Sequence, residues 1–251
     1  MIYKSSLQPG PGLQVSSKYD TQTVMLPSAG FVNVGRLGGM HTVTGTIYTK
    51  VGPNGRFWSP PDSNPTVSSS ANIVSTASRA VVLIFDTWSQ GASFTPGGLS
   101  NANGWPGPMI NLASGGVTAT FRGDSGTTVT ATGPTLNGIV RVAAKWTSGV
   151  GIALSVNGGQ IYTAALTDTD MYYGGILSLR CGPTGWFKVY FGAAIKGLVS
   201  DNDLVALSEN PYGEIFEAPP RRIWAPVGVS APAFKAAWAR QRSGVIGGGV
   251  R

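Results

Sequence analysis

The acidic side chains are the first candidates for chemistry, because two carboxylates on one strand face can cleave a glycosidic bond. In such a pair, one carboxyl group protonates the leaving oxygen while the other attacks or activates water. The chain holds 11 Asp and Glu residues, and most fall in expected turns or at a helix start, including Asp124, Asp168, Asp170, Asp201 and Asp203. No expected strand carries two of them at alternating spacing. We therefore expect no catalytic residues and a protein that is not an enzyme.

His41 is the only histidine, and Cys181 is the only cysteine. They exclude a His-rich or thiolate metal cluster and an intrachain disulfide. A Ser-His-Asp arrangement around His41 stays open, but the chain has no nucleophile-elbow motif, and a surface position on a strand is the favoured interpretation. Asp168 and Asp170 could offer loop oxygens to Ca²⁺, although ordinary turn chemistry explains them as well. We expect no bound metal and no cofactor.

Aromatic side chains in glycine- and proline-rich loops are candidates for sugar binding, because an aromatic ring can stack on the apolar face of a sugar. Trp58, Trp88 and Trp105 fall in or beside such loops. The alternative for each is a place at the end of the hydrophobic core. Trp105 is the preferred candidate, with Asn101 and Asn103 as hydrogen-bonding neighbours. These three residues form the predicted carbohydrate-binding site.

The formal charge of +7 is concentrated at the carboxyl end of the chain. Residues 1–217 hold 12 cations against 11 acids, a net charge of +1, whereas residues 218–251 hold six cations and no acid. In this tail, Phe234 and Trp238 fall on one face of a possible helix that is too short to be stable alone. We expect it to dock on a partner with acidic groups. The predicted anchoring residues are Arg221, Arg222, Trp224, Phe234, Trp238, Arg240 and Arg242.

Two alternatives to this anchor remain. One is a disordered basic tail, and the other is nucleic-acid binding, which ranks third because no stacking platform or recognised module accompanies the charge.

The composition favours a scaffold of strands. The chain has 36 glycines and 17 prolines, and only 12% of its residues are charged, which is typical of many short strands joined by tight turns. A chain of 251 residues with 42% hydrophobic content can bury one core. The amino terminus has no apolar signal-peptide core, and the aliphatic run at 80–85 is too short to span a membrane. We expect a soluble protein made in a reducing cytoplasm.

Alternating and continuous apolar runs locate the strands. Residues 79–86 form a continuous apolar strand that should be buried on both faces, whereas 58–72 and 91–108 are expected to be long loops because of their Gly, Pro and Ser content. The strongest local signal is the Asn-Gly turn at 157–158, which predicts a hairpin. A later strand over 186–195 should place Phe187, Val189 and Phe191 on one face.

A helix follows this last strand. Ser200 is a suitable N-cap with Asp203 three residues later, and Leu204, Ala206 and Leu207 supply an inward stripe. Asn210-Pro211 ends the helix.

The order of these pieces resembles the last part of the concanavalin A-like (laminin G-like) jelly rolls in virion proteins of tailed bacteriophages. The resemblance rests on the strand at 141–146, the Leu154-Ser-Val-Asn-Gly158 turn, the strand at 191–195, the helix with its Asn-Pro end, and the Pro219-Pro-Arg-Arg-Ile-Trp224 exit. Residues 1–78 carry no such likeness.

The resemblance implies an all-β chain, folded as an antiparallel β-sandwich with one short helix near 201–209 and extended terminal arms. The expected parts are an N-terminal arm (1–35), the jelly roll (36–217) and a basic anchoring tail (218–251).

The implied function is that of a structural virion protein in a tail fibre or head-tail appendage, made in the host bacterial cytoplasm. Its tail would bind other virion proteins of the tail, adaptor, portal or capsid, and host-surface polysaccharide is a candidate ligand. We expect a homo-oligomer, with no nucleic-acid partner and no membrane insertion. The alternatives are a capsid decoration protein and a glycan-degrading enzyme on the same fold.

Overall fold

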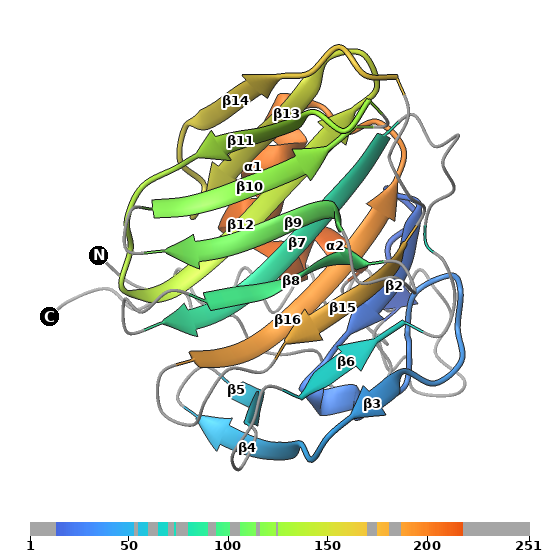
Figure 1. The fold of residues 1–251 in the computed structure, drawn as a ribbon. Helices are drawn as coiled ribbons and strands as arrows, with labels where there is room; N and C mark the ends of the chain where they lie inside the picture. The colour runs from blue at the N-terminus through green and yellow to red at the C-terminus, as the bar shows by residue number, and fades with distance from the viewer. Residues whose placement is uncertain are drawn as a thin grey trace, which may run out of the picture. The chain divides into compact units, whose positions relative to one another are not determined.

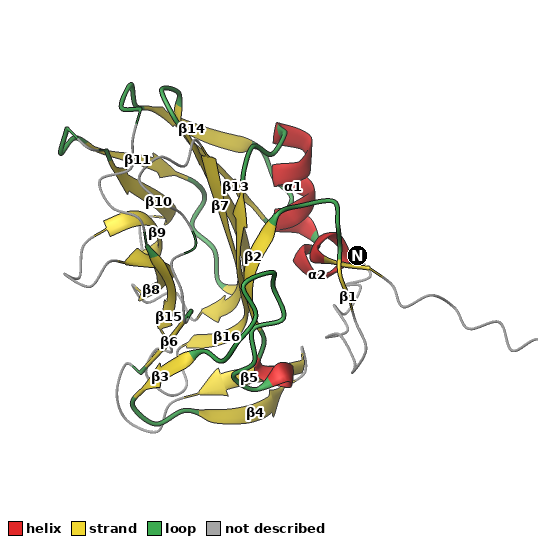
Figure 2. Cartoon of the chain, turned by 90° about the vertical axis from the view of Figure 1, so that its right-hand side faces the viewer, coloured by secondary structure: helices red, strands yellow, loops and turns green. Residues whose placement is uncertain are grey.

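The chain folds as two antiparallel β-sheets packed face to face, with two short helices on one outer side (Figures 1 and 2). This computed structural model describes residues 14–52, 55–59, 65–69, 73, 80–89, 94–100, 106–113, 116–123, 125–169, 175–180 and 187–217. The predicted all-β antiparallel sandwich is confirmed. None of the described helices is long and apolar enough to span a membrane.

The seven-stranded sheet has the order β11 (Thr128–Thr132), β10 (Gly116–Arg122), β9 (Pro106–Ala113), β8 (Phe94–Ser100), β15 (Ile176–Arg180), β6 (Thr66–Ser68), β3 (Thr42–Thr44). The second sheet has the order β14 (Ile161–Ala165), β13 (Gly151–Val156), β12 (Gly138–Thr147), β7 (Ala80–Ser89), β16 (Phe187–Lys196), β5 (Gly55–Ser59), β4 (Tyr48–Gly52), and β2 (Thr21–Met25) also pairs with β16. The remaining elements are β1 (Gln14–Val15), β17 (Phe216–Glu217), the 3₁₀ helix η1 (Pro27–Ala29), α1 (Asp201–Glu209) and α2 (Pro211–Ile215).

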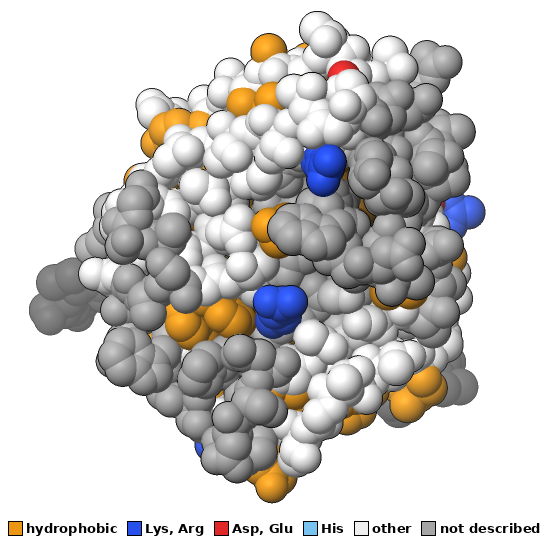
Figure 3. Space-filling view, viewed as in Figure 1, with side chains coloured by type: hydrophobic (Ala, Val, Ile, Leu, Met, Phe, Trp, Pro, Cys, Tyr) orange, Lys and Arg blue, Asp and Glu red, His pale blue; other side chains and the backbone are white. Residues whose placement is uncertain are grey.

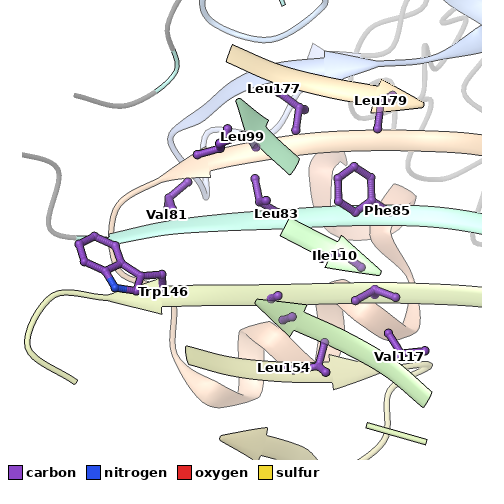
Figure 4. Packing of buried hydrophobic residues seen from close by; sticks show 14 of the residues in the cluster. Val81, Leu83, Phe85, Leu99, Ile110, Val117, Trp146, Leu154, Leu177 and Leu179 are labelled. Atoms are coloured by element: carbon purple, nitrogen blue, oxygen red, sulfur yellow. The ribbon is translucent and has the colours of Figure 1, made fainter. Parts of the chain in front are cut away.

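Strand β7 lies at the centre of the second sheet and contributes to two hydrophobic cores. Val81, Leu83 and Phe85 pack between the sheets, where Figure 4 shows them beside residues of both layers. Val82 and Ile84 point the other way, toward the core beneath the helices. All five are fully buried, so the expectation of a strand buried on both faces is confirmed.

Helix α1 begins and ends where its capping residues predict. The Ser200 Oγ accepts a hydrogen bond from the Asp203 backbone N–H at 3.1 Å. Leu204 and Leu207 are fully buried in the core beneath the helices, whereas Ala206 is half-buried. Asn210 ends α1 and caps α2, because its Oδ1 accepts from the Gly213 N–H at 3.2 Å. The sequence predicted the first helix and missed the second.

Two segments that composition assigns to loops contain strands. Within 91–108 lie β8 and the start of β9, and within 58–72 lies β6. Gly97 suits its strand because β8 and β15 approach closely, and a Cβ there would clash with the Ser178 carbonyl oxygen. Glycine in these segments therefore reflects tight strand packing as well as turns.

The predicted common face of Phe187, Val189 and Phe191 is wrong because β16 contains a β-bulge. Val189 pairs with Thr87 and Phe191 with Asp86, so one extra residue of β16 lies between two successive partners. Val189 consequently packs between the sheets, and Phe191 packs beneath the helices.

His41 is a buried residue, which corrects the expectation of a surface position. Its side chain is 5% exposed, and its Nε2 lies 3.2 Å from the Val24 carbonyl oxygen. Asn33 Oδ1 accepts from the Val24 N–H at 2.9 Å. The two side chains thus give hydrogen-bond partners to the Val24 backbone groups on the edge of β2 that faces away from β16. Burial lowers the pKa of His41.

Part of the predicted N-terminal arm belongs to the sandwich. Strand β2 pairs with β16, and its Val24 and Met25 are fully buried. The assigned boundaries of arm, jelly roll and tail stay a prediction, since 1–13 and 218–251 lie outside the described residues.

Candidate functional site

The outer face of the seven-stranded sheet is the most distinctive surface of the described chain. Side chains alternate along each strand, so the register with buried Ala119 and Phe121 fixes which residues point outward. We call this surface the hydroxyl face. Its outward side chains are Thr42, Thr44, Thr66, Ser68, Thr95, Met109, Asn111, Thr118, Thr120, Arg122, Thr128, Thr130, Thr132, Ile176, Ser178 and Arg180.

Most of these side chains are Thr or Ser, and the described part of the face carries no acidic residue. Figure 3 views the molecule from this side and shows, over its described part, scattered basic groups and hydrophobic side chains among residues of other types and backbone, with a single acidic group near the edge. Threonine satisfies two requirements here, because its branched Cβ suits a strand and its hydroxyl faces solvent. The result is a sheet face with neutral hydrogen-bonding groups on neighbouring strands, exposed along β3 and β11 and half-buried toward the middle.

Neighbouring hydroxyls hold one another in position across the strands. Thr120 Oγ1 lies 3.2 Å from Thr130 Oγ1, and Ser68 Oγ lies 2.9 Å from Ser178 Oγ. A hydroxyl offers one donor and two acceptor lone pairs, so each such pair retains capacity for an external partner. The face can therefore exchange hydrogen bonds with the hydroxyls of a sugar while its own rotamers stay ordered.

Near the centre of the face, the strand position held by Gly98 has no side chain. Gly98 lies on β8, the fourth of the seven strands, with Met109 and Ser178 as its neighbours. A Cβ at Gly98 would lie 2.8 Å from the Pro108 carbonyl oxygen. Because glycine has no side chain, a ligand can approach the backbone at this position.

The predicted sugar-binding residues Asn101, Asn103 and Trp105 lie outside the described residues, as do Asp170 and Cys181. Residues 101–105 connect β8 to β9, both of which belong to the hydroxyl face. The assignment of these three residues to sugar binding stays a prediction.

The two other tryptophans fall at the sandwich itself. Trp58 is fully buried, and its ring stacks on Phe31 with 5.9 Å between the centroids, so it belongs to the hydrophobic core and not to a sugar-binding loop. Trp88 is half-buried, and the Lys188 Nζ lies 4.5 Å from its ring centroid.

Two carboxylates at the helices, Asp203 and Glu214, form ion pairs with the same lysine. Lys18 Nζ lies 2.9 Å from Asp203 Oδ1 and 2.7 Å from Glu214 Oε2. The Tyr19 hydroxyl donates to the same two carboxylates at 3.1 and 3.0 Å. Hydrogen bonds from Ser200 and Lys18 lower the pKa of Asp203 to about 2, and the carboxylates raise the pKa of Lys18. A carboxyl group held ionised in this way is unsuited to serve as a general acid near neutral pH.

The one buried acid on a described strand faces a cation. Asp86 is 3% exposed on β7, and its Oδ2 lies 3.5 Å from Arg141 Nε on the adjacent strand β12. Arg141 Nη1 also donates to the Glu209 carbonyl oxygen at 2.8 Å. This pair therefore ties the end of α1 to the sheet.

Asp168 stabilises a turn by accepting a hydrogen bond. Its Oδ2 accepts from the Ser125 hydroxyl at 2.6 Å. Among described residues, no group of three or more His, Cys, Asp or Glu side chains is placed to hold a metal ion.

All seven predicted anchoring residues lie in 218–251, outside the described residues. The structure does place the points where the terminal segments begin. Gln14 pairs with Glu217 in the β1–β17 ladder, and Ser16 N–H donates to the Ile215 carbonyl oxygen at 2.8 Å. Both segments therefore start from one place on the helix side, and the hydroxyl face lies on the opposite side of the sandwich (Figure 2).

No family model and no curated protein matches this chain. Solved structures of botulinum neurotoxin binding domains share its fold. The serotype C1 binding domain is 12% identical with a TM-score of 0.58, and the match covers 75% of this chain and 51% of that one. The serotype G binding domain is 10% identical with a TM-score of 0.57, covering 74% and 50%. The chain thus spans about half the length of these structures, and the likeness at this identity identifies a shared β-sandwich.

Proposed function

We propose that the chain is a non-catalytic carbohydrate-binding module displayed on the virion of a tailed bacteriophage, and that the hydroxyl face is its binding surface. One observation carries the proposal: a sheet face whose described outward residues include no acid and whose hydroxyls pair across neighbouring strands. Such a face offers many weak, geometrically fixed hydrogen bonds and no described pair of facing carboxylates.

The positions of Gln14 and Glu217, where the described body begins and ends, support display on a larger assembly. The described body begins and ends at the β1–β17 ladder on the helix side. In this proposal, attachment is made through the terminal segments, and the ligand binds the hydroxyl face on the other side of the described sandwich. The predicted partners are tail, adaptor, portal or capsid proteins, which bind the basic tail through Arg221, Arg222, Trp224, Phe234, Trp238, Arg240 and Arg242.

The fold relatives are consistent with ligand binding by this kind of sandwich. One of the related structures concerns cell entry of botulinum neurotoxin type C through interaction with two ganglioside molecules, with a TM-score of 0.54 at 12% identity, covering 75% of this chain and 50% of that one. The phage placement rests on the resemblance of the region 139–224, and a tail fibre or head-tail appendage is the proposed location. Several copies per appendage would give useful avidity from weak sugar contacts.

Binding of purified full-length protein to host-surface polysaccharide tests the proposal. The double substitution Thr120→Val and Thr130→Val keeps side-chain shape and strand propensity but removes two hydroxyls. We expect a loss of about tenfold in affinity, since each hydrogen bond contributes about 0.5–1.5 kcal/mol. Thr163→Val is the matched control, because Thr163 is an exposed strand threonine in the other sheet.

Equal affinity of the double variant and wild type would place binding elsewhere, for example at the predicted Trp105 site. New reducing ends after incubation with the polysaccharide would contradict the non-catalytic part of the proposal. Locating the chain in a density map of the intact particle tests the virion placement.

A further inference from the structure

The hydroxyl face carries two charged side chains among its described residues, and both are arginines. Arg122 ends β10, and Arg180 ends β15. Among the described residues, the strands of this face carry no acid. Asp168 lies at the turn that follows Arg122, where its Oδ2 accepts from the Ser125 hydroxyl, so Arg180 is the better placed of the two for an anionic ligand. A sheet whose described strands carry positive charges and no negative ones is complementary to an anionic ligand.

Arg180 is the more exposed of the two. It lies directly opposite Thr66 on β6, and Thr66 lies opposite Thr44 on β3. Ser178 precedes it on the same face. A guanidinium group recognises a carboxylate through two parallel hydrogen bonds, and adjacent hydroxyls can bind the ring oxygens and hydroxyls of the same sugar.

Arg122 lies at a second position across the sheet. Strands β9 and β8 separate its strand from β15, and the register places Arg122 near the level of Ile176, four residues before Arg180. Three strand spacings and four residues along a strand correspond to about 20 Å between the two positions. Gly98 lies between them, so an extended chain can cross the sheet without meeting a side chain there.

We propose that the hydroxyl face selects acidic polysaccharides, with Arg180 pairing with a sugar carboxylate and Arg122 providing a second cationic contact. This inference rests on the proposed function and names its ligand class. A polysaccharide is favoured over single-stranded nucleic acid because the described residues of the face offer no aromatic ring for base stacking, and the body of residues 1–217 has a net charge of only +1.

The test compares the intact protein on matched polymers: polygalacturonate, polysialic acid, and the carboxyl-reduced, neutral form of each. We expect wild type to bind at least one acidic polymer about tenfold or more tightly than its neutral form, in line with a charge-assisted hydrogen bond. Arg180→Gln should remove most of that preference while leaving affinity for the neutral form unchanged. Arg36→Gln is the control, because it removes the same charge from an arginine that pairs with Asp20 away from this face.

Several results would overturn the inference. Equal weakening by Arg180→Gln and Arg36→Gln would indicate general electrostatics, and binding of single-stranded DNA as tightly as the acidic polymers would indicate a different ligand class. Equal binding of acidic and neutral polymers would refute acid selection while leaving carbohydrate binding in place. Binding of no polymer, including host polysaccharide, would refute this inference and the proposed function together. Circular dichroism and urea unfolding of each variant establish that it is folded.

Discussion

Protonation of Asp86 should stabilise the fold in mildly acidic solution. The carboxyl group lies on β7 beneath the helix layer, 3% exposed, with Arg141 and Tyr212 as its neighbours. Burial raises its pKa to about 6, against the opposing effect of Arg141. In the unfolded chain the same group has its ordinary pKa of 3.8.

The sign of the effect follows from proton binding. Between pH 4 and 6 the folded protein holds the Asp86 proton more tightly than the unfolded chain, so stability is greatest below the unfolded pKa and falls as pH rises through the folded pKa. The interval from 3.8 to about 6, at about 1.36 kcal/mol for each pH unit, corresponds to about 3 kcal/mol lost between pH 4 and pH 7.

Other groups contribute to the same profile and must be separated. Burial lowers the pKa of His41, so the folded state loses stability as pH falls below the ordinary value of 6.5. The lowered pKa of Asp203 contributes stability above its ordinary value that is lost as pH falls toward 2, and solvent screening reduces it because that side chain is 31% exposed.

Urea unfolding of wild type and Asp86→Asn, followed by tryptophan fluorescence from pH 4 to 8, isolates the Asp86 contribution. The Asn side chain has nearly the same shape and does not titrate, so His41 and Asp203 cancel in the difference. We expect the stability of wild type relative to the variant to fall by about 3 kcal/mol across the range. A constant difference would refute the reasoning, because it would mean that Asp86 has the same pKa in both states.

Three further substitutions test the packing and the turns. Leu207→Ala should lower the free energy of unfolding by about 2–5 kcal/mol, measured in urea, because Leu207 is fully buried beneath the helix layer; a loss below about 1 kcal/mol would show that α1 is not docked there. Asn157→Ala should lower the free energy of unfolding by about 1–3 kcal/mol, because Asn157 has φ 50° and its side chain makes two hydrogen bonds to β12. Asn157→Gly should recover the share of that loss that comes from the positive φ, and a thermal melt measures the difference. Gly151→Ala should destabilise by more than about 2 kcal/mol, because φ is 124° and the Cβ would clash with the Ala164 carbonyl oxygen; an unchanged melting temperature would contradict the pairing of β13 with β14.

Local signals in the sequence were sufficient where neighbours along the chain determine the structure. The Asn157-Gly158 hairpin needs left-handed residues at its turn, and both have positive φ. Ser200 and Leu204 fix the start and the buried stripe of α1. The apolar run of β7 indicated burial on both faces, since no polar residue interrupts 80–85.

Other features depend on contacts between distant segments. The bulge in β16 is specified by the pairing of Val189 and Phe191 with successive residues of β7, which no period in β16 reveals. His41 is buried because a loop carries it over the edge of β2.

The hydroxyl face was present in the sequence only in pieces. Alternating threonines, such as Thr118 and Thr120, marked individual strands, but the order of strands that joins them into one surface comes from tertiary pairing. A search for outward Thr and Ser on every expected strand would have given the only early signal.

The two-residue ladder between β1 and β17 also has a mechanical consequence. Because Gln14 and Glu217 are antiparallel partners, tension between the two chain ends peels this ladder open one residue at a time. The force path ends at the helix side, so shear does not reach the large sheets until the ladder has opened. A body built in this way can bear a pull on its two ends while the geometry of its outer sheet stays undistorted.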